Sequence, residues 1–420
     1  MSGRGTLSEG IDGEDRLIAP VPRVTIQAFC ETPGVAKVIE TAAGDRRMHK
    51  AHVKIQMGGG PAAVEAYRQA PTPNVIVIEL PGDRSGILGH LDNLAEVCDE
   101  GTKVVVIGHV NDVVLYRDLT RRGVSEYLIT PVPVLEFVSA ISELFTSSGA
   151  DPVGRTIAIV GAKGGVGAST IAHNLGWTIA DKLMTSTVVA DLDIAFGTAA
   201  LNFNQDPPQS VAEAIFAPDR LDGNLVDRLL SRCSDRLSLL AAPAILDRTV
   251  DLSETAVDGL IDILRASVPA VVLDVPHAWS GWIKRTLIGV DQIVIVAAPE
   301  LASLRNAKSL FETLRQSRPN DHAPKIVLNL TGIPKRPEIP ASEFGKALGA
   351  PLTAILPFDA QLFGMAANNG QMIAEVQPSS RAAEIFLELA CAVTGRGETK
   401  RSRMNLLEPI LARFARRKAS

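Results

Sequence analysis

The sequence contains few cysteines, and none lies near another. Its 420 residues include only Cys30, Cys98, Cys233 and Cys391, without a C-x-x-C pair or another metal-binding spacing. This pattern argues against an iron–sulfur reductase and against a disulfide-stabilised secreted domain. We expect four reduced, buried thiols, as in a cytosolic protein.

The sequence also lacks long apolar runs and an excess of positive charge. No run reaches the length of a bilayer span, and the first residues, MSGRGT, form no hydrophobic signal core. Lysine and arginine (42) are outnumbered by aspartate and glutamate (47), which gives a formal net charge of −5. A protein that coats nucleic acid usually carries the opposite charge. These absences predict a cytoplasmic protein with no nucleic-acid partner.

The length and the 46% of hydrophobic residues are sufficient for two domains with cores of their own. Between two patterned regions, residues 146–155 combine small and polar residues with glycine and proline, as linkers do. The predicted division is a disordered leader (1–22), a first domain (23–145), this linker (146–155), a second domain (156–395) and a basic tail (396–420).

Both domains alternate predicted strands with predicted helices. The first has five predicted strands, at 24–29, 53–56, 74–79, 103–107 and 126–129. The second has seven, at 156–160, 187–191, 236–241, 270–274, 292–297, 325–329 and 352–356. This alternation predicts an α/β fold with two doubly wound parallel sheets. Such sheets bind ligands at the carboxyl ends of their strands.

A glycine-rich loop joins the first strand of the second domain to a helix. Residues 156–170 read TIAIVGAKGGVGAST, an apolar strand followed by small residues. Gly164, Gly165 and Gly167 allow backbone N–H groups to close on an anion, and the helix start adds its free N–H groups and positive dipole end. Ser169 stands where a P-loop hydroxyl would hold Mg²⁺. The alternative is a glycine-rich turn without a ligand.

An ordinary P-loop places lysine directly before the hydroxyl residue, but this chain has Ala168 there, and Lys163 precedes the double glycine. This arrangement resembles the deviant Walker A loop of the MinD/ParA family, K-G-G-V-G-K-[ST], and the variant KGGVGAST resembles CpaE/TadZ-type pilus-assembly proteins. The resemblance implies a homodimer in which Lys163 reaches the nucleotide of the partner subunit. The residues implied to bind ATP are Lys163, Gly164, Gly165, Val166, Gly167, Ala168, Ser169 and Thr170.

Polar residues follow three further predicted strands. They are Asp191, Asp193, Asp274 and Asn329. The resemblance implies that Asp191 and Asp274 join Ser169 around Mg²⁺, that Asp193 acts on the attacking water, and that Asn329 hydrogen-bonds adenine. Carboxylates at a strand end can converge on one cation. The alternatives are turn or capping roles for Asp191 and Asp193, and a turn role for Asn329.

Ala168 removes the cation that normally follows phosphate charge into the transition state. Binding would then depend on backbone N–H groups, Mg²⁺ and the partner's Lys163. We therefore expect weak or absent ATP hydrolysis, with the nucleotide acting mainly to hold a dimer together.

The first domain resembles a response-regulator receiver domain, on VIVIELPG at 75–82 and EYLITP at 126–131. Glu79 stands at the position of the phosphoacceptor aspartate, and Thr130 replaces the lysine. Phosphoryl transfer needs an acceptor at the right reach, a metal and a cation. We predict that this domain is not phosphorylated and serves docking or dimerisation. Glu79 is either a fixed phosphate mimic or an ordinary surface glutamate.

The basic tail has apolar residues at helical spacing, which fits a weak contact with an anionic membrane. Packing on its own domain and disorder are the alternatives. The chain as a whole resembles CpaE/TadZ proteins of the tight-adherence (Flp, type IVc) pilus system. That resemblance implies a factor at the cell pole whose partners are the pilus secretion ATPase and other pilus assembly proteins. The alternatives are a ParA-type ATPase in DNA partition or cell-division positioning, and a scaffold that binds no nucleotide.

Overall fold

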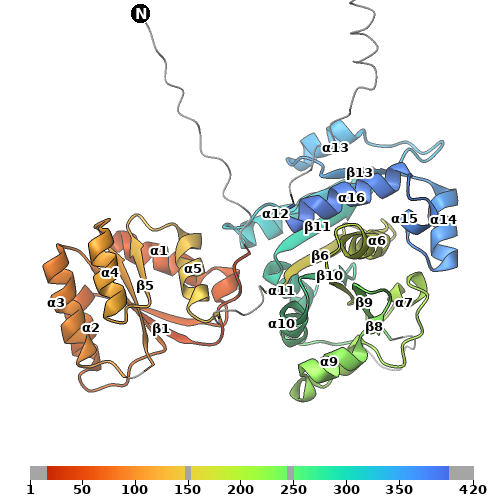
Figure 1. Cartoon of the computed structure of the whole chain (residues 1–420). Coiled ribbons are helices and arrows are strands. Elements are labelled where there is room, and N and C mark those ends of the chain that lie inside the picture. The colour runs from red at the N-terminus through yellow and green to blue at the C-terminus, as the bar shows by residue number, and fades with distance from the viewer. Residues whose placement is uncertain (1–16, 100, 147–152, 244–249, 397–420) are drawn as a thin grey trace, which may run out of the picture.

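Two α/β units, each built on its own sheet, make up the described part of the chain (Figure 1). The computed structural model describes residues 17–99, 101–146, 153–243 and 250–396. The predicted fold class, two doubly wound parallel sheets, is confirmed. Among the helices of these residues, none is long and apolar enough to cross a bilayer.

The first sheet has five parallel strands in the order β2–β1–β3–β4–β5. The strands are β1 (Thr25–Cys30), β2 (His52–Met57), β3 (Val75–Leu80), β4 (Lys103–Gly108) and β5 (Glu126–Ile129). Helices α1 (Pro33–Ala43) and α5 (Val134–Glu143) cover one face, and α2 (Gly59–Tyr67), α3 (Arg84–Ala95) and α4 (Val113–Arg121) cover the other. Every residue of β3 is buried, which explains its continuous apolar run.

The last residues of the predicted leader pack on this first unit. Val21 is fully buried in the core beside α1 and α5, and its N–H donates to the Arg47 carbonyl at 2.8 Å. Ser142 donates to the carbonyl of Ala19 at 2.8 Å. The prediction of a disordered leader is therefore wrong for residues 19–22, because an apolar side chain there completes the core. Residues 1–16 lie outside the described part.

The second sheet has eight strands in the order β13–β12–β11–β6–β10–β7–β9–β8. The strands are β6 (Arg155–Gly161), β7 (Thr187–Asp191), β8 (Ser231–Arg232), β9 (Leu237–Leu240), β10 (Ala270–Val275), β11 (Gln292–Ala297), β12 (Lys325–Thr331) and β13 (Ala354–Pro357). The seven predicted strands are present and parallel. The antiparallel β8 was not predicted, because two residues are too few to show an apolar period.

Helices cover both faces of the second sheet. One face carries α6 (Ala168–Asp181), α7 (Ala199–Asn202), α14 (Ala360–Asn369), α15 (Ile373–Val376) and α16 (Arg381–Thr394). The other carries α8 (Val211–Ile215), α9 (Gly223–Leu229), α10 (Asp258–Ser267), α11 (Gly281–Gly289), α12 (Leu301–Ser317) and α13 (Ala341–Leu348). A Cβ on Gly176 would lie 2.2 Å from Val189, so this glycine lets α6 pack closely on the sheet.

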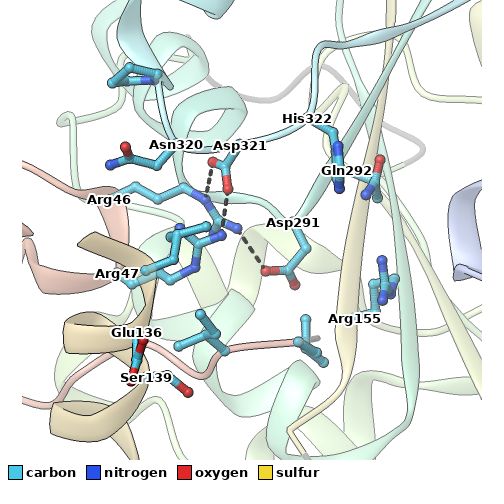
Figure 2. Close-up of a pocket in the computed structure, with 14 residues that line it drawn as sticks. Arg46, Arg47, Glu136, Ser139, Arg155, Asp291, Gln292, Asn320, Asp321 and His322 are labelled. Carbon is cyan, nitrogen blue, oxygen red and sulfur yellow. Dashed lines mark hydrogen bonds and ion pairs between the residues drawn. The ribbon is translucent and has the colours of Figure 1, made fainter. Parts of the chain in front are cut away.

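Buried ion pairs connect the two units (Figure 2). Arg46, in the short 3-10 helix η1 (Arg46–Met48), donates to Asp321 at 2.7 Å, to Asp291 at 3.1 Å and to the carbonyl of Gly289 at 2.8 Å. Asp291 immediately precedes β11, and Asp321 precedes β12. The first unit therefore contacts the amino ends of the second sheet's strands, at the edge opposite the glycine-rich loop.

Three further arginines complete this charged contact. Arg47 pairs with Asp45 at 3.0 Å and with Asp321. Arg265 lies 3.2 Å from Asp291, and Arg318 lies 2.9 Å from Asp321. A cavity of about 540 Å³ adjoins them. Figure 2 shows its polar lining, which includes Arg46, Arg47, Glu136, Ser139, Gln292 and Asn320.

Candidate functional site

The glycine-rich loop forms an open cradle between β6 and α6. Strand β6 ends at Gly161, and α6 begins at Ala168. Gly165 (φ +77°) and Gly167 (φ +82°) adopt the left-handed backbone conformation that favours glycine. No side chain caps the start of α6, so its first N–H groups remain for an external acceptor. An anion bound here would accept these N–H groups and face the positive end of the helix dipole.

Two side chains from neighbouring strand ends support this loop. Asn329 of β12 donates from Nδ2 to the Val166 carbonyl at 2.8 Å. His277, which follows β10, donates from Nδ1 to the Gly161 carbonyl at 2.9 Å. A Cβ on Gly167 would lie 2.6 Å from the Asn329 Nδ2, so only glycine fits beneath this amide. The structure thus places Asn329 at the loop as a support, and its contact with adenine stays a prediction.

Lys163, in the loop, forms an ion pair with Glu300. The side chains are 45% and 34% exposed. Glu300 occupies the N-cap position of α12 but makes no capping hydrogen bond. An exposed ion pair of this kind contributes little stability, so Lys163 can exchange Glu300 for another anion.

The helix that follows the loop begins with three partly exposed residues. They are Ala168, Ser169 and Thr170. The methyl group of Ala168 stands at the first helical position, where an ordinary P-loop would place an ammonium group. Lys163 is therefore the one lysine of the loop, and its ammonium group lies beside Glu300.

Two buried aspartates lie side by side on adjacent strands. Asp191 ends β7 and pairs in register with Asp274 of β10. They are 0% and 3% exposed. Burial, together with the charge of Asp274, raises the pKa of Asp191 well above its usual range. A cation between these carboxylates would offset both effects, so the pair fits a divalent metal ion.

Asp193 lies two residues further on, in a turn. Its Oδ1 accepts a hydrogen bond from the Phe196 N–H at 3.0 Å, and its carbonyl accepts one from the Gly197 N–H at 2.7 Å. The turn role that the sequence leaves open is therefore present. A role of Asp193 toward water stays a prediction, and the side chain remains partly exposed at the strand's carboxyl end.

His173 is a neighbour of these aspartates that sequence reasoning missed. It lies on α6, one helical turn after Ser169, and it is 1% exposed. Its Nε2 is 3.3 Å from an Asp274 oxygen, and its Nδ1 is 2.8 Å from the Asn202 side-chain nitrogen. The sequence did contain a signal for it: His173 is a polar residue four positions after Ser169, and residues at that spacing lie on the same face of a helix.

Glu79 of the first unit is buried at the receiver-like position. It accepts hydrogen bonds at 2.8 Å from the N–H groups of Glu31 and Thr32 and from the Thr32 hydroxyl, and it lies 3.0 Å from Nε2 of His109. Burial raises the pKa of Glu79, but these hydrogen bonds outweigh burial and lower it overall. The surface interpretation of Glu79 is therefore wrong, because its carboxylate joins two loops to β3.

Several known proteins are similar to parts of this chain, although no protein-family model matches it. The pilus assembly protein CpaE from Caulobacter crescentus, in its crystal structure, is 47% identical over 31% of this chain and 98% of that one, with a TM-score of 0.30. The ParA family ATPase from Chlorobium tepidum is 26% identical over 56% of this chain and 98% of that one, with a TM-score of 0.51.

MinD proteins are a second group of similar proteins. The septum site-determining protein MinD of Bacillus subtilis is 24% identical over 58% of this chain and 90% of its own length. MinD from Pyrococcus horikoshii, solved in complex with Mg-ADP, is 19% identical over 57% of this chain and 96% of that one, with a TM-score of 0.51. At this identity, the likeness to the Pyrococcus structure shows the fold alone.

Proposed function

Because the chain belongs to the family of CpaE pilus assembly proteins and shares the MinD/ParA ATPase fold, we propose that it binds ATP with Mg²⁺ as a nucleotide-linked homodimer. One observation carries this proposal. The start of α6 has no side-chain cap and lies behind a loop in which Gly165 and Gly167 adopt left-handed backbone. Such a loop presents N–H groups to phosphate oxygens.

In this proposal, each residue of the site has a stated task. The N–H groups of residues 163–170 hold the phosphates, and Asn329 maintains the loop beneath them. Ser169, Asp191 and Asp274 hold Mg²⁺, which would neutralise phosphate charge when bound. The buried, closely spaced aspartates fit that ion, because burial and mutual repulsion favour a cation between them.

We further propose that hydrolysis is slow. Ala168 offers no cation to the leaving phosphate, and Lys163 is the one lysine of the loop. Lys163 would leave Glu300 for the nucleotide of the partner subunit as the dimer forms. Asp193, at the carboxyl end of β7, is the residue proposed to position water for the residual reaction.

The proposed biological role is localisation of a tight-adherence pilus assembly system. This role rests on family membership and on the receiver-like unit. Because Glu79 of that unit is engaged in structural hydrogen bonds, we assign the unit to docking and not to phosphoryl transfer. The proposed partners are the pilus secretion ATPase and other pilus assembly proteins, at the cytoplasmic face of a cell pole. A weak membrane contact of the basic tail belongs to the same proposal, and residues 397–420 lie outside the described part of the chain.

Nucleotide-dependent dimerisation tests the proposal. The full chain, Lys163→Ala and the control Lys346→Ala would be measured by light scattering with millimolar ATP–Mg²⁺, with ADP–Mg²⁺ and without nucleotide. Lys346 is an exposed lysine on α13, so its variant should dimerise like the full chain. Lys163→Ala should remain monomeric while still being stabilised thermally by ATP–Mg²⁺, since binding to the folded state alone raises the melting temperature. A full chain that stays monomeric and gains no thermal stability from ATP would refute the proposal.

A further inference from the structure

His173, Asp191 and Asp274 form a buried group that combines oxygen and nitrogen donors. One ligand atom from each lies within 4.8 Å of the other two. All three side chains are excluded from solvent. The group comes from three elements: α6, β7 and β10. It therefore exists only once the helix after the loop has packed on the sheet.

The imidazole of His173 lacks a partner on the side that faces the aspartates. Its Nε2 is buried and makes no hydrogen bond within the described residues, although Asp274 Oδ2 is 3.3 Å away. An unsatisfied buried polar atom destabilises the fold. An ion that accepts the Nε2 lone pair and neutralises the carboxylates would remove both penalties.

Contacts from outside the group orient two of these side chains, His173 and Asp191, as contacts around metal ligands do. His173 Nδ1 lies 2.8 Å from the side-chain nitrogen of Asn202, a contact that fixes the ring with Nε2 toward Asp274. Asp191 accepts N–H hydrogen bonds from Asp193 and Ala199, both at 3.1 Å, one on each oxygen. The donor atoms of His173 and Asp191 are thus held before an ion arrives.

The donor set differs from the one that Mg²⁺ prefers. Mg²⁺ takes oxygen ligands and keeps most of its waters, whereas imidazole nitrogen suits first-row transition ions. We propose that His173, Asp191 and Asp274 form a site for a divalent first-row transition ion such as Mn²⁺, bound more tightly than Mg²⁺ and without nucleotide. This inference rests on the proposed function, because Asp191 and Asp274 are the carboxylates assigned there to Mg²⁺.

A small cavity adjoins His173. It measures about 60 Å³ and is lined by Thr170, His173, Asn174 and Asn202, together with residues of α14 and α15. A water molecule occupies about 30 Å³ of liquid, so the cavity has room for water beside the His173 ring. The cavity lies beside α6, one turn along from Ser169.

Titration with Mn²⁺ tests this inference directly. The full chain without nucleotide would be titrated while the electron paramagnetic resonance signal of free Mn²⁺ is recorded, with and without excess Mg²⁺. We expect one Mn²⁺ per chain and an affinity at least about tenfold higher than for Mg²⁺. His173→Gln should lose that preference and keep its Mg²⁺ affinity within about threefold, because the oxygen donors remain. His49→Ala, which removes an exposed histidine, should bind like the full chain.

A spectroscopic readout separates ligation from a structural effect. Electron spin-echo modulation of bound Mn²⁺ should show coupling to an imidazole nitrogen in the full chain and none in His173→Gln. Equal Mn²⁺ and Mg²⁺ affinities in the full chain, or a nitrogen signal that persists in His173→Gln, would overturn the site.

Thermal stabilisation by ATP–Mg²⁺ is measured on the same samples. If stabilisation persists without Mn²⁺ preference, this inference alone fails; if Mn²⁺ binds without stabilisation by ATP, the proposed function fails.

Discussion

Arg46 donates to Asp291 at 3.1 Å, across the contact between the two α/β units. The other oxygen of Asp291 accepts hydrogen bonds from the N–H and hydroxyl of Thr156, both at 2.9 Å. Thr156 lies near the start of β6, the strand that ends in the glycine-rich loop. One buried carboxylate therefore connects the receiver-like unit to the strand that carries the glycine-rich loop.

Replacing Arg46 should weaken this contact strongly. Arg46→Ala leaves Asp291 and Asp321 buried with fewer cations, and removal of one partner of a buried pair costs roughly 3–5 kcal/mol. Urea unfolding at pH 7 should show a loss of this order, and small-angle scattering should show a more extended chain. Arg122→Ala is the control, because its pair with Asp92 is 40% and 60% exposed and contributes little stability. Equal losses in both variants would contradict the role of the contact.

The contact should also fail in acid. Burial raises the pKa of Asp321, but Arg46 and Arg318 outweigh burial and lower it from 3.8 to about 2. A carboxyl group with a depressed folded-state pKa stabilises the fold above its unfolded pKa, and this stabilisation disappears as the pH falls through the folded-state pKa. The contribution, about 2.5 kcal/mol for this shift, should be complete above pH about 5 and lost toward pH 2.

Urea unfolding of the full chain and of Asp321→Asn between pH 7 and pH 2 would measure this loss. The variant should be less stable at pH 7 and should lose less stability on acidification. Parallel pH profiles for the two proteins would exclude Asp321 as the responsible group.

Restoring the missing lysine should raise ATP turnover. Ala168 is the first residue of α6 and is partly exposed, so a longer side chain can extend into the loop opening. Ala168→Lys should increase the single-turnover hydrolysis rate roughly tenfold or more, because its ammonium group can follow the phosphate charge. Ala168→Met has a similar length without the charge and should leave the rate unchanged. A Met variant that hydrolyses ATP as fast as the Lys variant would show that bulk, and not charge, limits the reaction.

Glu300 should restrain Lys163 in the free chain. Glu300→Gln removes the charge that pairs with Lys163, so at a given ATP concentration more dimer should form, by roughly two- to fivefold. Its unfolding free energy should change by less than about 1 kcal/mol, since the pair is exposed. Glu312→Gln, on the exposed side of the same helix, is the matched control. Weaker dimerisation of Glu300→Gln would show that the carboxylate assists the dimer instead of competing with it.

Glu79 should stabilise the first unit, and its position should not accept a phosphoryl group. Glu79→Ala leaves the Glu31 and Thr32 N–H groups without their acceptor, which should cost roughly 3 kcal/mol in urea unfolding. Glu79→Asp should not acquire a phosphoryl group from acetyl phosphate, because Thr130 stands where the receiver lysine would be. Intact-mass spectrometry after incubation with acetyl phosphate checks this. A gain of one phosphoryl group by Glu79→Asp would refute the prediction.

Local patterns were sufficient for the elements and for the loop. The alternation of strand and helix patterns predicted the twelve longer strands, several of them as continuous apolar runs, and β8 escaped because it has two residues. The glycine spacing predicted the cradle, since left-handed backbone at Gly165 and Gly167 is a property of those residues themselves. The resemblance implied that Asp191 and Asp274 share one metal ion, and the register of β7 and β10 places them side by side.

The sequence by itself thus determined two parallel sheets, a phosphate-type loop without its usual lysine, and an acidic pair at the same edge. Only the tertiary structure decided which distant side chains meet: Arg46 with Asp291, 245 residues away, and His173 with Asp274. Periodicity reports which face of an element is buried, but not which element covers that face. The pairing of buried charges depends on strand order and domain docking, and these are set by packing across the whole chain.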